Sequence, residues 1–381
     1  MTDALDTLAH TEIVERGVAP SAVVGVAVLR DGELHVALGA AGRTADRPTD
    51  TESVFDLASI TKPFVGVAAA RLVERGVVRF ETAVSELVEE SRGTPSASVT
   101  LEQLLGHRSG LEAHLSLFAP LTARATVSRP EMLARALLAR RADCAGTPPE
   151  SGFSPVYSDL GYLIAGELLT RVASMPLDEL VMNEVSRPLG LSARSARQWL
   201  GAGEDFAARV APTEYVDFRG GLVRGVVHDE NAWAYSGHGL SGHAGLFGTA
   251  RDVLGLGMAV LAGLSGHGSG WLSRETLAHL VRERPGGSLR LGFDGKSGPN
   301  ASAGPSASAL TFGHLGFTGT SLWCDPVAGC ATVLLTNRVC PSRRNGAIRE
   351  ARPRVHEALF AFGRGARFAD DGTRGAGRNP K

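Results

Sequence analysis

The chain of 381 residues is 43% hydrophobic and 21% charged, so it can bury a large core as one big domain or two ordinary ones. Its 39 Lys and Arg residues nearly balance its 40 Asp and Glu residues, which argues against a nucleic-acid surface or a polyanionic partner. The sequence shows neither a basic start followed by an apolar run nor an apolar run long enough to cross a bilayer. We therefore expect a cytoplasmic protein without a membrane partner.

The chain is expected to begin with a helix followed by two strands. Leu5, Leu8 and Ile13 fall on one side of a helix over residues 4–16. Residues 23–29 and 34–38 are apolar runs rich in β-branched side chains, and they flank Asp31-Gly32. Asp-Gly between such runs is the strongest short signal for a β-hairpin.

Ser59 and Lys62 stand three residues apart where an apolar segment becomes a helix. Apolar residues repeat at helical spacing from position 64 to 73, so the helix is expected to end near Gly76. Residues three apart share a helix face, so the Lys62 amine can approach the Ser59 hydroxyl. At a helix start the Ser59 N–H is free and the dipole is positive, which would stabilise an oxyanion on a substrate carbonyl. Alone, the pattern is common, and such a serine is ordinarily an N-cap.

Helices are expected through most of residues 59–261, with loops between them. Thr100 and Gln103 have the spacing of a capping box at a helix start, and Thr249 and Asp252 repeat that spacing. These signals predict a large, mainly helical region in the middle of the chain.

Tyr157 comes directly before an apolar helix over residues 160–169, whose start Ser158 or Asp159 would cap. A tyrosine in that position can project into a cleft. Beside Lys62, its pKa would be lowered by the ammonium, so it could accept the Ser59 proton and return it to a leaving group. The alternative is a tyrosine packed beneath a loop.

The last third of the chain predicts further strands and a closing helix. Residues 286–288 and 295–309 are rich in Gly, Ser, Ala and Pro and are expected to be mobile. Strands are expected at residues 310–312, 321–324 and 331–336, and a helix at 349–362. A strand carrying His314, with Gly316 permitting close approach, would present backbone groups to an extended ligand. The alternative is a glycine-rich loop between strands.

Strands near both ends with helices between them predict an α+β fold. The sheet part is expected over about residues 1–60 and 310–363, with the helical part over about 61–280 inserted in it. Residues 1–363 would form this domain, and residues 364–381, rich in glycine and charge, would form a flexible tail.

Cysteines and histidines give no metal-site spacing. Cys324 and Cys330 flank a turn-like segment and could face each other across a hairpin, but without an export signal a disulfide is not expected. His228, His238 and His243 fall in one glycine-rich region and could suggest a metal or a catalytic base. We expect a polar loop network near the cleft instead, and neither a metal nor a cofactor.

Three motifs in this order resemble the serine β-lactamase and penicillin-binding protein superfamily, specifically its class C-like branch. Ser59-Ile60-Thr61-Lys62 is similar to its nucleophile motif, Tyr157-Ser158-Asp159 to its Tyr-x-Asn motif, and His314-Leu315-Gly316 to its Lys-Thr-Gly strand motif. Residues 104–111 and 242–252 also look familial, and the similarity runs from about residue 10 to 362. The resemblance implies a β-lactamase/DD-peptidase-like fold, in which terminal helices flank an antiparallel sheet that carries a large helical insertion.

The resemblance also implies roles for individual residues. Ser59 would be the acylated nucleophile, with Lys62 and Tyr157 sharing the proton transfers, and the N–H groups of Ser59 and Phe317 would form the oxyanion hole. The residues implied to contact the substrate are Asp159, His314 and Gly316. His314 replaces a lysine that holds a substrate carboxylate in β-lactamases, while Asp159 replaces an asparagine and would favour a charged Lys62.

These departures favour a serine hydrolase that cleaves an ester or amide through an acyl-enzyme on Ser59, without a strong demand for a carboxylate beside the scissile bond. Its expected partner is a small-molecule ester, amide or peptide substrate. β-Lactamase, DD-peptidase or D-aminopeptidase activity remains an alternative, as does a penicillin- or peptide-binding protein without turnover. The sequence leaves the substrate and the oligomeric state open.

Overall fold

A seven-stranded sheet organises the chain. The computed structural model describes residues 2–30, 33–44, 46–203, 205–268 and 270–365. The strand order is β3-β2-β1-β12-β11-β10-β9, and every neighbouring pair is antiparallel. The strands are β1 Ser21–Arg30, β2 Glu33–Thr44, β3 Arg47–Pro48, β9 Asp294–Gly295, β10 Phe312–Leu315, β11 Ser321–Asp325 and β12 Cys330–Thr336.

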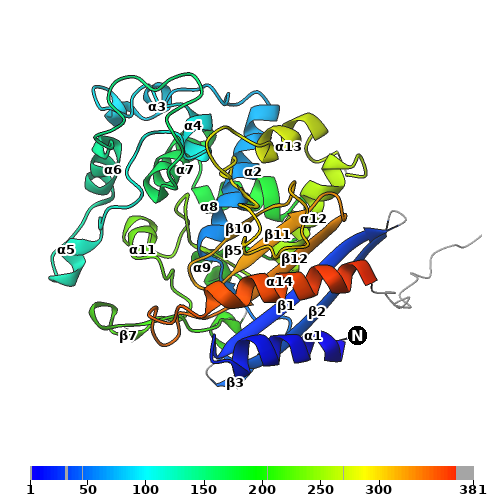
Figure 1. The fold of residues 1–381 in the computed structure, drawn as a ribbon. Coiled ribbons are helices and arrows are strands. Elements are labelled where there is room, and N and C mark those ends of the chain that lie inside the picture. Colours follow the sequence, from blue (N-terminus) through cyan, green and yellow to red (C-terminus); the bar gives the residue numbers. More distant parts are fainter. Residues whose placement is uncertain (1, 31–32, 45, 204, 269, 366–381) are drawn as a thin grey trace, which may run out of the picture.

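Both faces of this sheet are covered, because its central strands alternate between two cores. Val23 and Ala27 of β1 belong to the core on the α12 face, while Val24 and Val26 belong to the core under α14. Figure 1 shows the C-terminal helix α14 lying across the sheet beside the N-terminal helix α1. The period of two in a strand places successive side chains on opposite faces, so a near-continuous apolar run is what a central strand of this kind requires.

Most other elements lie between the two halves of the sheet in sequence, and in Figure 1 the helices α2 to α8 gather to one side of it. Two short sheets, β4-β8-β5 and β6-β7, complete the strands. The helices are α1 Thr2–Ala9, α2 Thr61–Glu74, α3 Val84–Leu87, α4 Leu101–Leu105, α5 Ala119–Thr122, α6 Arg129–Leu138, α7 Asp159–Ala173, α8 Leu177–Val181, α9 Ala196–Gly201, α10 Phe206–Arg209, α11 Glu230–Ser236, α12 Ala250–Leu264, α13 Arg274–Val281 and α14 Ile348–Gly365. The short strands are β4 Phe55–Asp56, β5 Arg194–Ser195, β6 Tyr215–Val216, β7 Gly221–Leu222 and β8 Leu246–Gly248; 3₁₀ turns span Ala58–Ile60, Glu89–Ser91 and Asp217–Arg219, and π-helical turns span His10–Glu15 and Met182–Ser186.

The predicted α+β fold is confirmed, and most predicted elements are present. The first hairpin forms with Arg30 paired to Glu33, although its turn, Asp31-Gly32, lies outside the described residues. Both capping boxes are present, at the starts of α4 and α12. The predicted tail begins inside α14, which extends to Gly365, and from residue 366 onwards it lies outside the described residues.

Two predictions in the last third of the chain are wrong. The strand expected at 310–312 begins only at Phe312 and runs to Leu315, because its pairing with β11 starts there. The segment 295–309, expected to be mobile, is packed. Its Ala303 and Ala307 are buried in the core under α14, and the Lys296 ammonium donates to the Pro305 carbonyl over 2.9 Å.

The two cysteines considered for a disulfide are free thiols on opposite faces of the sheet. Cys324 pairs with Ala331, so Cys330 stands one residue out of register. A shift of one residue turns a side chain to the other face, and the two thiols accordingly belong to different cores. Among the described helices, none combines the length and hydropathy that a bilayer span requires.

Candidate active site

Ser59 lies on a tight turn between β4 and α2. Ala58, just before it, has a φ of 47°, a left-handed conformation that is rare for a residue with a side chain. The Ala58 N–H donates to the Asp56 carboxylate over 2.8 Å, which holds the turn in place. Backbone strain of this kind costs on the order of 1–3 kcal/mol and gathers at functional sites. The turn places Ser59 in a cavity, while Lys62 follows in the first turn of α2.

Lys62 is fully buried, and every proton of its ammonium group has an acceptor. Its Nζ donates to Ser59 Oγ over 3.0 Å, to Asp159 Oδ1 over 2.7 Å and to the His243 carbonyl over 3.4 Å. Burial alone would lower the pKa of Lys62, but the charge of Asp159 and the neighbouring Tyr157 outweigh it and raise the pKa above its ordinary value. Lys62 is therefore an ammonium at neutral pH, in the direction expected from Asp159.

Tyr157 stands beside this pair, directly before α7. The Lys62 Nζ lies 4.6 Å from the centre of its ring, and the hydroxyl of Ser158 caps the helix by accepting from the Gly161 N–H. The expected lowering of the Tyr157 pKa is wrong. Burial raises the pKa and outweighs both the charge of Lys62 and the hydrogen bonds with Lys62 and Ser59. In the resting site Tyr157 therefore keeps its proton.

His107 supports Tyr157 from behind. The two rings stack with centroids 4.6 Å apart, and His107 Nδ1 accepts the Ser158 N–H over 2.9 Å. Burial holds the pKa of His107 well below its usual range, so the ring is neutral. His107 therefore packs against Tyr157 and hydrogen-bonds the start of α7 as a neutral ring.

The motif His314-Leu315-Gly316, at the end of β10, lies beside Ser59 and Tyr157. Some of its residues line the cavity and others are buried beneath it. Gly316 and Phe317 line the cavity, whereas His314 is buried beneath it, with its ring centre 5.9 Å from that of Tyr157. His314 Nδ1 donates to the Leu315 carbonyl over 2.8 Å, and burial lowers the pKa of the ring to about 3. At neutral pH His314 therefore adds no positive charge.

Two backbone N–H groups are unused on this wall. Within the described part of the chain, neither Ser59 nor Phe317 has a hydrogen-bond acceptor for its main-chain N–H. An unpaired N–H facing a cavity can bind an oxyanion at little cost in reorganisation.

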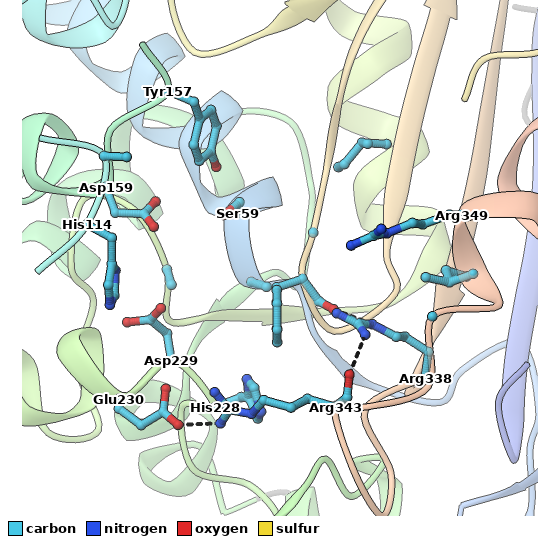
Figure 2. A pocket seen from close by; sticks show the side chains of 18 of the residues that line it. Ser59, His114, Tyr157, Asp159, His228, Asp229, Glu230, Arg338, Arg343 and Arg349 are labelled. Atoms are coloured by element: carbon cyan, nitrogen blue, oxygen red, sulfur yellow. Dashed lines mark hydrogen bonds and ion pairs between the residues drawn. The ribbon is translucent and has the colours of Figure 1, made fainter. Parts of the chain in front are cut away.

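The cavity has a volume of about 800 Å³ and walls of opposite charge. Figure 2 shows Asp159, Asp229 and Glu230 on one side of Ser59, with Arg338 and Arg349 on the other. The arginines that line it are Arg338, Arg343, Arg344, Arg349 and Arg352. Sequence reasoning missed them. The only signal was their density between positions 338 and 352, of which Arg349 and Arg352 fall within the helix predicted at 349–362.

Of the three histidines in the glycine-rich region, two are bonded to carboxylates near the cavity and one is exposed. His228 Nε2 lies 3.0 Å from Glu214, and His243 Nε2 lies 3.0 Å from Asp229, so these two form the expected polar network near the cleft. His238 is exposed and does not line the cavity. No group of three or more His, Cys, Asp or Glu side chains that could hold a metal occurs among the residues searched, which are the described ones.

The chain is similar to known proteins over most of its length. A family model described as Beta-lactamase matches residues 10–355. A putative D-alanyl-D-alanine carboxypeptidase from Salmonella agona (strain SL483) is 29% identical over 344 residues, covering 82% of this chain and 74% of that protein.

Solved structures share the fold. EstCE1, a hydrolase with promiscuous acyltransferase activity, superposes with a TM-score of 0.68 at 21% identity, covering 93% of this chain and 98% of its own. A class C beta lactamase from Rhodobacter sphaeroides gives a TM-score of 0.65 at 19% identity, covering 93% and 99%.

Proposed function

The chain belongs to the Beta-lactamase family, and from that membership we propose that it is a serine hydrolase that forms an acyl-enzyme on Ser59. The observation that carries the proposal is the 3.0 Å contact from the buried Lys62 Nζ to Ser59 Oγ. A hydroxyl becomes a competent nucleophile when a base within hydrogen-bond reach can take its proton.

The proton transfers follow from the charges in the site. Lys62 must first lose a proton, and because its pKa is raised, the competent fraction is small at neutral pH and grows as the pH rises. Ser59 Oγ then bonds to the substrate carbonyl carbon while its proton passes to the Lys62 amine. Tyr157 donates a proton to the leaving alcohol or amine as that bond to carbon breaks, and Lys62 restores the proton of Tyr157. Water repeats the sequence on the acyl-enzyme and releases the acid.

The unpaired N–H groups of Ser59 and Phe317 support an oxyanion hole. Both residues line the cavity, and the oxygen of a tetrahedral intermediate on Ser59 would take its negative charge between them. One such donor is worth roughly 100- to 1000-fold in kcat.

A carboxypeptidase-like activity is the second candidate, and the arginine wall favours it. Arg349 lines the cavity, and among the described residues it has no carboxylate partner. An exposed guanidinium of this kind suits a substrate carboxylate. The relative from Salmonella agona is named for an activity on D-alanyl-D-alanine. The terminal residue of that dipeptide, which a carboxypeptidase removes, carries such a carboxylate. This candidate differs from the expectation that, with His314 in place of a lysine, the enzyme does not require a carboxylate on its substrate.

The test is acylation of Ser59. A fluorophosphonate probe and p-nitrophenyl acetate should modify the wild-type protein at Ser59, and Ser59→Ala should lose turnover by at least roughly 1000-fold. Intact-mass spectrometry checks the adduct, and Ser174→Ala on the surface serves as the matched control.

The two candidates separate on substrate charge. A D-alanyl-D-alanine peptide and its C-terminal amide, compared with neutral esters, show whether the carboxylate is required. An unmodified Ser59 together with full turnover in Ser59→Ala would rule out the catalytic assignment altogether.

A further inference from the structure

The turn between β10 and β11, residues 316–320, is held by two arginines from elsewhere in the chain. Arg352, in the second turn of α14, donates from one Nη2 to the carbonyls of Gly316 and Thr320 over 2.6 and 2.9 Å. Arg338, just after β12, donates from Nε to the Phe317 carbonyl over 2.8 Å. Its own N–H reaches the Thr318 carbonyl over 3.0 Å. The backbone of the turn is therefore fixed by side chains from the segment just after β12 and from α14.

The same turn is tied directly to the nucleophile segment. Thr318 Oγ1 donates to the Asp56 carbonyl over 2.7 Å, and Thr320 Oγ1 donates to the Leu57 carbonyl over 3.0 Å. A Cβ at Gly316 would lie 1.9 Å from Thr320 Oγ1 and 2.7 Å from the Leu57 carbonyl oxygen, so the two segments touch backbone to backbone. The position of the Phe317 N–H relative to Ser59 follows from these contacts.

Both arginines are buried at a cost that no ion pair offsets. Arg338 and Arg352 are each 9% exposed, and among the described residues neither has a carboxylate partner. The Nε of Arg352 has no hydrogen-bond partner at all within the described part of the chain. Burying an unpaired charge is expensive, and burial together with Arg338 lowers the pKa of Arg352 to about 9. The Arg352 guanidinium contacts the turn, and that of Arg338 contacts both the turn and, through Nη1, the carbonyls of Arg343 and Asn345 over 3.0 Å.

We propose that Arg352 and Arg338 are positioning residues that clamp the β10–β11 turn and so aim the Phe317 N–H at the oxyanion formed on Ser59. This inference rests on the proposed acyl-enzyme function. The Nη2 of Arg352 donates to both carbonyls from a fixed position at the end of a planar guanidinium, whereas a lysine ammonium keeps the charge on a shorter side chain of different geometry. Arg352→Lys therefore tests position separately from charge.

The experiment measures kcat and KM with neutral p-nitrophenyl acetate, and the affinity for a phenylboronic acid that forms a tetrahedral adduct on serine. Displacing an oxyanion donor should lower kcat by roughly 10- to 100-fold and weaken the boronate similarly, with KM changed less than about threefold. Arg352→Lys, Arg338→Lys and Thr318→Val should all show this pattern. Thr318→Val breaks the tether to Asp56 without touching an arginine, so it decides the question if an arginine variant does not fold.

Arg354→Lys is the matched control, since it lies on the same helix but is partly exposed and pairs with Glu12. Folded Arg352→Lys and Thr318→Val proteins with kcat and boronate affinity within twofold of wild type would overturn the clamp. So would a loss confined to an anionic ester such as a succinate monoester, because Arg352 would then bind substrate itself. Failure of the wild type to react with a fluorophosphonate would instead reject the proposed function.

Discussion

Lys62 and Asp159 form the ion pair that sets the chemistry of this site. Lys62 is fully buried, and its ammonium has Asp159 2.7 Å away. Removing one partner of such a pair leaves the other charge without compensation. In the resting site Asp159 keeps Lys62 protonated by raising its pKa. Tyr157 stays neutral, because burial raises its pKa as well. The sequence motif identified these groups, but the direction of the Tyr157 shift depends on how deeply the fold buries it.

Asp159→Asn should move the activity profile to lower pH. The carboxylate raises the pKa of Lys62 against the effect of burial, so without it the pKa falls and the unprotonated amine is present at lower pH. The rise of kcat/KM with pH, measured on p-nitrophenyl acetate between pH 6 and 10, should therefore shift towards acid. Glu131→Gln on the exposed side of α6 is the control. A profile unchanged in Asp159→Asn would show that Lys62 is not the base.

At the scale of elements, the site depends on a close approach between α7 and the loop over residues 241–245. A Cβ at Gly242 would lie 1.8 Å from the Tyr162 carbonyl oxygen, and one at Gly166 would lie 2.9 Å from the Gly242 nitrogen. Only glycine allows the loop to pass so near the helix. The contact fixes the position of the His243 carbonyl, which accepts a hydrogen bond from Lys62, relative to α7, the helix that begins with Asp159.

Gly242→Ala should therefore destabilise the protein by at least about 1–3 kcal/mol, the usual cost of overpacking, and should also reduce turnover. Urea denaturation measures the first effect and ester hydrolysis the second. Gly201→Ala at the end of α9 is the matched control, because nothing lies within 4 Å of the added Cβ. This change should stabilise by up to about 1 kcal/mol. Equal effects of the two substitutions would contradict the close-approach argument.

At the scale of the whole molecule, the fold is closed by pairing β1 with β12 and covering the pair with α14. His356 of α14 is buried against the sheet, with Nε2 2.7 Å from Ser321 Oγ and Nδ1 2.8 Å from Thr332 Oγ1. Burial, with a smaller contribution from Arg352, lowers the pKa of His356 to about 3. The neutral ring thus joins the C-terminal helix to β11 and β12.

This burial predicts a loss of stability in acid. The unfolded chain binds a proton at His356 near pH 6.5, whereas the folded chain does so only near pH 3. The contribution of neutral His356 to the free energy of unfolding is complete above about pH 6.5. It is lost as the pH falls towards 3, at about 1.4 kcal/mol per pH unit for one histidine. His356→Gln should be less stable at pH 7 but show a shallower decline between pH 6.5 and 4.5.

Urea titrations at several pH values measure that slope, with the exposed His10→Gln as control. A slope in His356→Gln equal to that of the wild type would show that His356 does not titrate with unfolding.

Features that depend on near neighbours in the chain could be predicted from the amino-acid sequence. The spacing of Ser59 and Lys62, the capping boxes and the alternation in the central strands are local patterns, and local patterns fix helices, strands and turns. Tyr157 before α7 was identified in the same way. These features were enough to predict the fold class and to bring Lys62 and Tyr157 to Ser59.

The surroundings of those residues come from long-range packing, which the sequence motifs do not contain. It turned His314 inward, placed Cys324 and Cys330 on opposite faces, packed residues 295–309, and brought Arg338 and Arg352 to the turn that carries Phe317. Burial and charge at a site come from segments far apart in sequence. They set pKa values and donor positions that no spacing within a motif contains.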